Sequence, residues 1–246
     1  MTKAEIQFVR SLADKRTRDE ERLFIAEGKK LVEEIVASNL MIRRIYTTRT
    51  DIAHSALEVI DQKTMERISQ LKTASDTLAI VEQPRKKLNA NTLKGRLTLA
   101  LDGVQNPGNL GTIVRLADWF GVDNIICSAE CADVYNPKVV QATMGAIIRV
   151  GVHYTDNLAA LLKDAAANNL PIYGTLLDGN NIYSEKLPSE GIIVMGNEGR
   201  GLSDECRNTL THKLLIPPYP ADAPTSESLN VAMATGIILA EFRRPR

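Results

Sequence analysis

The stretch LTLALDGVQNPGNLGTIVRLADWFGVDNIICS, residues 97–128, contains the pattern that decides the fold. An apolar run of strand length leads through a turn of Asn106, Pro107 and Gly108 into apolar residues at helical spacing, and a second apolar run follows. Buried strands that alternate with helices in this way are typical of a parallel sheet covered on both faces. The pattern therefore predicts an α/β fold with a mostly parallel sheet.

The same alternation continues to the end of the chain. Further strands are expected at 149–155, 171–178, 192–196 and 213–218, and helices at 109–121, 137–148, 157–169, from 203 and from 228. Ligands of such sheets bind beyond the carboxyl ends of the strands. Three segments rich in Gly, Asn and Pro follow expected strands, at 101–121, 194–205 and 216–237. We expect these three segments to surround one ligand site.

The N-terminal third shows a smaller α/β pattern. Apolar residues recur at helical spacing over residues 6–12 and 31–36, and short strand-like runs lie at 43–48 and 77–84. We therefore expect a small α/β domain at 1–92.

A polar stretch at residues 84–96 has no apolar period and contains Pro and Gly, so we expect a linker there and a second domain at 96–246. At 246 residues and 44% hydrophobic composition, the chain can bury two cores. No apolar run is long enough to cross a bilayer, and the charged N-terminus lacks the apolar centre of a signal peptide. We expect a cytoplasmic protein with no membrane partner.

The cysteines do not suggest a metal site. Cys127, Cys131 and Cys206 are odd in number and lack paired ligand spacing, and the three histidines are scattered. Zinc sites usually need four ligands, so we expect no metal and interpret the thiols as structural.

Charge is distributed unevenly although the net charge is zero. Residues 1–95 carry 18 Lys and Arg against 14 Asp and Glu, whereas residues 96–246 carry 12 against 16. Two basic groups in the first half could neutralise the phosphates of a polyanion: Lys15, Arg16, Arg18 and Arg22, and the triplet Arg85, Lys86 and Lys87. A solvated surface that also carries acidic residues explains them equally well.

The first Gly- and Asn-rich segment places two polar residues near a helix start. Asn109 is a suitable N-cap, and Leu110 begins the apolar side of the following helix. Arg115 lies about 140° around the helix from Leu110 and faces away from that side. Taken alone, Asn109 is explained as a cap and Arg115 as a surface residue.

The second segment, residues 196–201, contains three glycines, which allow close approach of a backbone to a ligand or simply a tight connection. Ser203 is expected to cap the next helix. The glycines match neither GxxxxGK[ST] nor GxGxxG, which argues against nucleotide triphosphates and dinucleotides. Glu198 would be stabilised as a carboxylate if backbone N–H groups or an arginine held it.

The third segment leads into a strongly apolar helix. Ser228 is a candidate cap for that helix, and small residues such as Ala232 and Gly236 permit close packing. A helix of this kind must be buried, either against the core or against a second subunit.

Together, the three segments resemble the three signature motifs of the SpoU (TrmH-like) family of RNA ribose methyltransferases, in the SPOUT superfamily. The matching patterns are NxGxxxR (Asn109, Gly111, Arg115), GNEGRGLS (196–203), and IP (Ile216, Pro217) followed by SLNVA (228–232). The resemblance implies a deep C-terminal trefoil knot, S-adenosylmethionine as methyl donor, and a homodimer. It also implies that the N-terminal domain is a ribosomal-protein-like, RNA substrate-binding domain.

The resemblance also implies residue roles. Backbone groups of Gly196, Ile216 and Leu229 would hold the cofactor. The catalytic cluster would comprise Asn109, Arg115, Glu198, Ser228 and Asn230. The connection at 217–227 is longer than in typical members, and its prolines supply no backbone N–H. 

Arg115 has two possible roles. Its counterpart in the family is proposed as the base that takes the ribose proton, but a guanidinium stays protonated to very high pH. Bidentate binding of a neighbouring phosphate is the other possibility.

These features predict methylation of a ribose 2′-hydroxyl in structured RNA, with ribosomal RNA preferred because a separate domain suits a structured substrate. Three alternatives remain open: a transfer-RNA ribose methyltransferase, a non-catalytic RNA-binding protein, and an unrelated α/β enzyme that uses another nucleotide.

Overall fold

The structure is a computed structural model, and it describes residues 1–246 except 52, 85–87, 89–92, 221–225, 227 and 246. Contacts between residues divide the chain into two compact units. The first unit comprises Met1–Arg85 and Asp133–Ile148, and the second comprises Lys86–Ala132 and Arg149–Arg246. The segment Asp133–Ile148 thus belongs with the first unit, although the sequence pattern places it in the 96–246 domain.

The first unit is a small α/β structure. Its elements are α1 (Lys3–Ser11), α2 (Lys15–Glu21), β1 (Leu23–Glu27), α3 (Lys29–Val36), β2 (Ile42–Thr47), β3 (Leu57–Val59), α4 (Gln62–Ile68), β4 (Thr77–Glu82), α7 (Pro137–Ala142) and the 3-10 helix η1 (Ala146–Ile148). The strand order is β1-β4-β2-β3. Strands β1 and β2 are antiparallel to β4, and β3 is parallel to β2.

Helices α1 and α4 share a core with the sheet. Ile6 and Val9 of α1 and Met65 of α4 belong to one buried cluster with residues of β1 and β4. A capping box between Thr2 and Glu5 fixes the start of α1. The helices and strands expected in the N-terminal third therefore occur close to their predicted positions.

A buried ion pair attaches Asp133–Ile148 to the first unit. Arg18 is 1% exposed, and its Nη2 lies 2.6 Å from Oδ2 of Asp133. Its Nη1 donates to the carbonyl oxygens of Leu12 and Ala13, so Arg18 does not contribute to a phosphate-binding surface as the sequence suggested. Tyr135 packs against Phe24 with ring centroids 5.0 Å apart.

The helix expected at 137–148 is interrupted. Helix α7 ends at Ala142, and a separate 3-10 turn covers Ala146–Ile148. Met144 (φ 50°) and Gly145 (φ 91°) have left-handed backbone conformations that cannot continue a right-handed helix.

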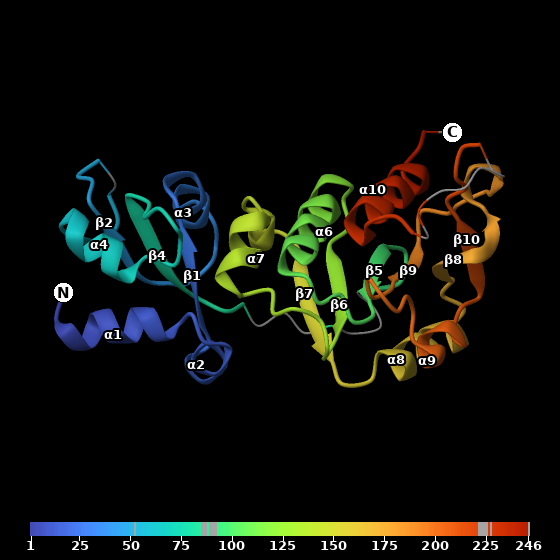
Figure 1. Cartoon of the computed structure of the whole chain (residues 1–246), viewed down its shortest axis with the longest axis horizontal. Helices are drawn as coiled ribbons and strands as arrows, with labels where there is room; N and C mark the ends of the chain where they lie inside the picture. Colours follow the sequence, from blue (N-terminus) through green and yellow to red (C-terminus); the bar gives the residue numbers. More distant parts are fainter. Residues whose placement is uncertain (52, 85–87, 89–92, 221–225, 227, 246) are drawn as a thin grey trace. The chain divides into compact units, whose positions relative to one another are not determined.

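The second unit contains the predicted parallel sheet (Figure 1). Its elements are β5 (Leu97–Leu101), α6 (Pro107–Trp119), β6 (Asn124–Ser128), β7 (Gly151–Thr155), α8 (Leu158–Ala167), β8 (Ile172–Asn181), the 3-10 helix η2 (Ile182–Ser184), β9 (Gly191–Met195), α9 (Asp204–Arg207), β10 (His212–Leu215) and α10 (Val231–Phe242). The strand order is β10-β8-β9-β5-β6-β7, and every neighbouring pair is parallel.

Helices cover both faces of this sheet, as predicted. Leu158 and Leu162 of α8 share a buried cluster with Ile172 of β8. Successive side chains of a strand point to opposite faces, so Tyr173 faces the other way and meets Phe242 of α10. Helices α10 and α6 contact each other (Figure 1). The sheet is therefore buried between α8 on one face and α10 with α6 on the other.

Some expectations fall on residues that the structure does not describe. The basic triplet Arg85, Lys86 and Lys87 lies outside the described residues, as do most of the linker 84–96 and most of the second half of 217–227. Among the helices that are described, none is both long and apolar enough to cross a membrane.

Candidate active site

The three segments singled out in the sequence begin at one edge of the second sheet. They follow β5, β9 and β10, and parallel strands all present their carboxyl ends at the same edge. Strand β9 lies directly beside β5, and β10 lies two strands from β9. This arrangement brings residues that are 89 and 121 positions apart in the chain within hydrogen-bonding distance.

Asn106, rather than Asn109, caps helix α6. The Oδ1 atom of Asn106 accepts hydrogen bonds from the backbone N–H groups of Gly108 (2.8 Å) and Asn109 (3.1 Å). Pro107 occupies the first helical position, where its missing N–H is harmless. The side chain of Asn109 is therefore free from capping and can make contacts with the other two segments.

Glu198 is held at the start of α6. Its Oε1 accepts hydrogen bonds from Nδ2 of Asn109 (2.9 Å) and the backbone N–H of Asn106 (3.2 Å), and its Oε2 accepts one from the N–H of Gln105 (3.4 Å). Partial burial alone would raise the pKa of Glu198, but these hydrogen bonds outweigh it and lower the pKa below its ordinary value. Glu198 is therefore an ionised carboxylate at neutral pH.

Asn230 connects the third segment to the first. Its Nδ2 donates to Oδ1 of Asn109 at 3.0 Å, and its Oδ1 accepts from the backbone N–H groups of Ala232 and Met233. Asn230 is thus the cap of α10, which corrects the assignment of Ser228. The hydrogen-bonded chain Glu198–Asn109–Asn230 joins all three segments.

The loop after β9 is shaped by a residue that the sequence analysis did not single out. Asn197 donates from Nδ2 to the carbonyl of Gly103 (2.7 Å), and its Oδ1 accepts from the N–H groups of Gly199 and Arg200. Asparagine beside glycine is a known turn signal, so the pattern could have identified it. At Gly196, a Cβ atom would lie 2.4 Å from the backbone carbon of Gly201. Only glycine fits there.

Ser203 caps α9, as predicted, because its hydroxyl accepts from the N–H of Cys206. Its own N–H and hydroxyl donate to Oδ2 of Asp102 at the end of β5, at 2.7 and 2.8 Å. A second set of hydrogen bonds therefore holds the loop after β9 to the end of β5.

The structure does not bring Arg115 and Ser228 into the hydrogen-bonded chain. Both are exposed, and neither side chain makes a hydrogen bond or ion pair with any residue in the described ranges. Arg115 lies on the outer side of α6 and is available to a ligand or to another chain.

The residues expected to hold a cofactor lie at the ends of the strands. Gly196 follows β9 directly, Ile216 follows β10 directly, and Leu229 immediately precedes Asn230. Gly196 and Ile216 are half-buried, whereas the side chain of Leu229 is 51% exposed. An ionised carboxylate and an exposed apolar side chain fit S-adenosylmethionine, which combines a positive sulfonium with an adenosine. Among the described residues, no group of three or more His, Cys, Asp or Glu side chains is arranged so that it could hold a metal ion.

Comparison with known proteins identifies two families that match this chain. Residues 96–240 match the SpoU rRNA Methylase family, and residues 3–84 match the MRM3-like substrate binding domain. The chain is 29% identical over 241 residues to the Bacillus subtilis 23S rRNA (guanosine(2553)-2′-O)-methyltransferase RlmP, covering 95% of this chain and 94% of that protein. It is 34% identical to the 23S rRNA (guanosine-2′-O-)-methyltransferase RlmB of Neisseria meningitidis, over 61% of this chain and 59% of that protein.

Two solved structures are similar over almost the whole chain. A protein from Porphyromonas gingivalis assigned to the TrmH family of RNA methyltransferases is 37% identical, with a TM-score of 0.89 and coverage of 99% of this chain and 98% of that one. An rRNA methyltransferase from Sinorhizobium meliloti with bound AdoMet is 30% identical, with a TM-score of 0.86 and coverage of 99% and 95%.

The Glu198–Asn109–Asn230 chain thus joins the three segments that resemble the family motifs, within a match that covers more than half of the sequence. The chain belongs to the SpoU rRNA Methylase family.

Proposed function

We propose that this chain transfers a methyl group from S-adenosylmethionine to a ribose 2′-hydroxyl of structured RNA, and that this RNA is ribosomal RNA. The observation that carries the proposal is the Glu198–Asn109–Asn230 chain, since it gathers three distant segments at the ligand-binding edge of the sheet. Relatives named as 23S rRNA 2′-O-methyltransferases support ribosomal RNA as the substrate.

The reaction is a displacement in which the 2′-oxygen forms a bond to the methyl carbon and the bond from that carbon to sulfur breaks. S-adenosylmethionine supplies an electrophilic methyl group and leaves as a neutral thioether. The protein's contribution is then mainly alignment. Asn109 and Glu198 hold the start of α6 against the loop after β9, and Asn230 fixes the start of α10 against both. Ser228 lies two residues before Asn230 and completes the proposed cluster.

Arg115 is proposed to position the RNA. Its guanidinium is exposed on α6 and can bind a phosphate through two parallel hydrogen bonds. The ribose proton then passes to that phosphate or to solvent, because a guanidinium does not accept a proton near neutral pH.

Gly196, Ile216 and Leu229 are proposed to hold the cofactor, chiefly through backbone groups. The main chain at these positions lies at the ends of β9 and β10 and at the start of α10. The similar Sinorhizobium structure with bound AdoMet supports this cofactor.

A homodimer with a knotted second domain is proposed from the family resemblance. Exposed apolar side chains on the two adjacent helices support a subunit interface, since Trp119 of α6 is 84% exposed and Met233 of α10 is 64% exposed. A cytoplasmic location is proposed because bacterial relatives act on ribosomal RNA.

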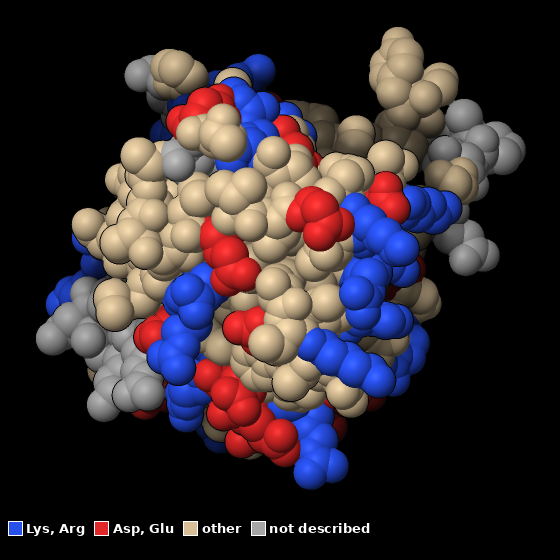
Figure 2. Space-filling view, turned by 90° about the vertical axis from the view of Figure 1, so that its left-hand side faces the viewer, with Lys and Arg blue, Asp and Glu red and all other residues tan. Residues whose placement is uncertain are grey.

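The N-terminal domain, residues 1–92, is proposed to bind the RNA substrate, while residues 96–246 carry the methyl transfer. The match to a substrate binding domain supports this division. Exposed cations in the described part of this region are Lys3, Arg10, Lys15, Arg16, Arg22, Lys29, Lys30, Arg43, Arg44, Lys63, Arg67 and Lys72. Figure 2 shows Lys and Arg side chains gathered along one side of the face that it views. Such cations favour a polyanion.

Mapping of 2′-O-methyl sites in cells with and without this protein tests the substrate. The proposal expects one ribosomal RNA site to lose its methyl group in cells that lack the protein. Loss only from transfer RNA would make transfer RNA the substrate, and no loss would favour a non-catalytic RNA-binding protein.

Thermal unfolding with S-adenosylmethionine, NAD or ATP tests the cofactor, because a ligand that binds the folded state raises its stability. Stabilisation by NAD or ATP alone would favour another α/β enzyme.

A further inference from the structure

A cavity of about 330 Å³ lies at the outer edge of the second sheet, away from the three motif segments. It runs alongside the edge strand β10 and the end of β8, and its lining includes Tyr173, Asn180, Thr211, His212 and Lys213. None of the proposed catalytic or cofactor residues lines it. Its volume is near the lower end of the range of about 300–1,000 Å³ that is usual for small-molecule sites.

Stacked rings form one wall of this cavity. The ring of Tyr173 meets Phe242 edge-on at 5.0 Å and stacks on His212 at 4.8 Å with an interplanar angle of 27°. Tyr173 and Phe242 are buried, whereas His212 is exposed. A further planar ring can therefore join this stack only on the outer face of His212.

The His212 ring is held in place before any ligand arrives. Its Nδ1 lies 2.8 Å from Oγ1 of Thr211, and the same hydroxyl bonds the backbone of Ile172. The hydroxyl accepts from the N–H of Ile172, and its contact with Nδ1 fixes the orientation of the His212 ring in either tautomer. A fixed ring loses little conformational entropy on stacking.

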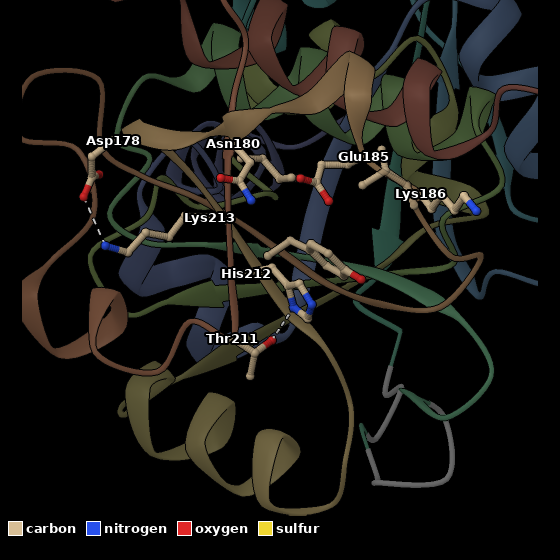
Figure 3. Close-up of a pocket in the computed structure, with 10 residues that line it drawn as sticks. Asp178, Asn180, Glu185, Lys186, Thr211, His212 and Lys213 are labelled. Carbon is tan, nitrogen blue, oxygen red and sulfur yellow. Dashed lines mark hydrogen bonds and ion pairs between the residues drawn. The ribbon is translucent and has the colours of Figure 1, made fainter.

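Positive charge exceeds negative charge beside the cavity, because Arg207, which does not line it, also pairs with Asp178. Asp178 accepts hydrogen bonds from Lys213 (3.0 Å) and from Arg207 (3.0 Å), so two cations share one carboxylate. The hydrogen bond from Lys213 lowers the pKa of Asp178, which is therefore ionised at neutral pH. Figure 3 shows Asp178 and Lys213 on one side of the cavity, and Glu185 and Lys186 on the other. The surplus cation can attract a phosphate.

We propose that this cavity binds one nucleotide of the RNA around the edge strand β10, with its base stacked on His212 on one face of the strand and its phosphate beside Lys213 on the other. The inference rests on the proposed function, since it assumes an RNA substrate. His212 begins β10 and Ile216 follows its end, which places them about 13 Å apart at the usual rise of a strand. The bound nucleotide is therefore a different one from the nucleotide whose ribose is methylated.

RNA binding by variants of the full-length chain tests the proposal, with an unmodified 23S ribosomal RNA transcript as the probe. His212→Ala should weaken binding of the transcript about 5- to 150-fold, the range expected for loss of one base–aromatic stack. His212→Phe keeps a stacking ring and should restore most of the affinity. The affinity for S-adenosylmethionine should stay unchanged in both variants, whereas a general structural defect would lower it.

The phosphate contact has its own test. Lys213→Gln should weaken binding and lower the slope of log Kd against log salt by about one. Lys163→Gln, on the exposed side of α8, removes the same charge outside the cavity and should leave both quantities nearly unchanged.

Specific results would overturn the inference. Equal transcript affinity for wild type and His212→Ala would do so, as would failure of His212→Phe to restore binding. Titration with AMP distinguishes a nucleotide of the RNA from a free nucleotide as the occupant of the cavity. If AMP binds the wild-type protein saturably while His212→Ala binds the transcript as tightly as wild type, the cavity is a site for free nucleotides. If the wild-type protein binds RNA through His212 but transfers no methyl group, the proposed function fails while the cavity remains an RNA site.

Discussion

Glu198 is the only carboxylate in the hydrogen-bonded chain of the candidate active site, and its environment favours the charged form. In Glu198→Gln, a side-chain NH₂ group replaces one oxygen that now accepts backbone hydrogen bonds. We expect this change to lower the free energy of unfolding by about 1 kcal/mol at pH 7. Denaturant unfolding measures it, with the exposed Glu205→Gln as control.

The same variant tests the pKa of Glu198. The pKa of Glu198 is lower in the folded state than in the unfolded state, so its carboxylate stabilises the fold. This stabilisation is complete at pH values above the pKa of the unfolded state, and it is lost as the pH falls through the pKa of the folded state. The difference between wild type and Glu198→Gln should therefore be constant from pH 7 to about pH 5.5 and shrink below the ordinary glutamate pKa of about 4.3. A difference that grew on acidification would show that the pKa is raised.

Arg115→Lys separates phosphate positioning from cofactor binding. Lysine keeps the charge but cannot form two parallel hydrogen bonds to a phosphate. We expect kcat to fall about 10- to 100-fold while the affinity for S-adenosylmethionine is unchanged. Methyl-transfer assays and calorimetry check the two parts, with Arg244→Lys as a matched surface control. Unchanged turnover would refute the positioning role.

At the scale of single elements, the loop after β9 depends on close backbone contact at Gly196. Alanine at this position would bring Cβ to 2.4 Å from the backbone carbon of Gly201 and 2.5 Å from the nitrogen of Leu202. Neither backbone atom can move without displacing the loop, so Gly196→Ala should cost about 1–3 kcal/mol and weaken cofactor binding. Thermal unfolding and calorimetry measure these effects.

Gly199→Ala is the control within the same loop. Its Cβ atom would lie 3.7 Å from Oδ1 of Asn197, which is an ordinary contact. It should leave stability and cofactor affinity close to those of wild type. Equal losses of stability and cofactor affinity in Gly196→Ala and Gly199→Ala would contradict the conclusion that close backbone contact requires glycine at position 196.

Helix starts illustrate what the sequence could and could not predict. The order of strands and helices in the second unit follows the apolar pattern, but two caps were placed wrongly, at Asn109 and Ser228. Local signals pointed to the right residues, since proline at the first helical position marks Asn106 and the apolar run begins directly after Asn230. Freed from capping, Asn109 instead links Glu198 to Asn230.

Local sequence patterns could not predict contacts between residues that are far apart in the chain. Burial of Arg18 depends on Asp133, which is 115 positions away, and therefore its charge was wrongly assigned to the surface. The stack of Tyr173 on His212 likewise depends on the pairing of β8 with β10. The three motif segments were found from sequence because each carries its own Gly, Asn or Pro signal.

At the scale of the whole molecule, the proposed homodimer makes Trp119 a sensitive position. If α6 and α10 form the subunit interface, a charge in place of this indole would be buried without a partner. We expect Trp119→Glu to shift the protein from dimer to monomer, measured by sedimentation equilibrium. Met41→Glu, an exposed apolar residue of the first unit, is the control and should leave the association state unchanged.

Transfer of a tritiated methyl group from S-adenosylmethionine to unmodified ribosomal RNA, followed by digestion to nucleosides, tests the central claim that the three segments form one ribose-methylating site. The account predicts label in a single 2′-O-methyl nucleoside, with little or none for Asn109→Ala, which breaks the link between Glu198 and Asn230. Label on a base, or full activity of Asn109→Ala, would contradict it.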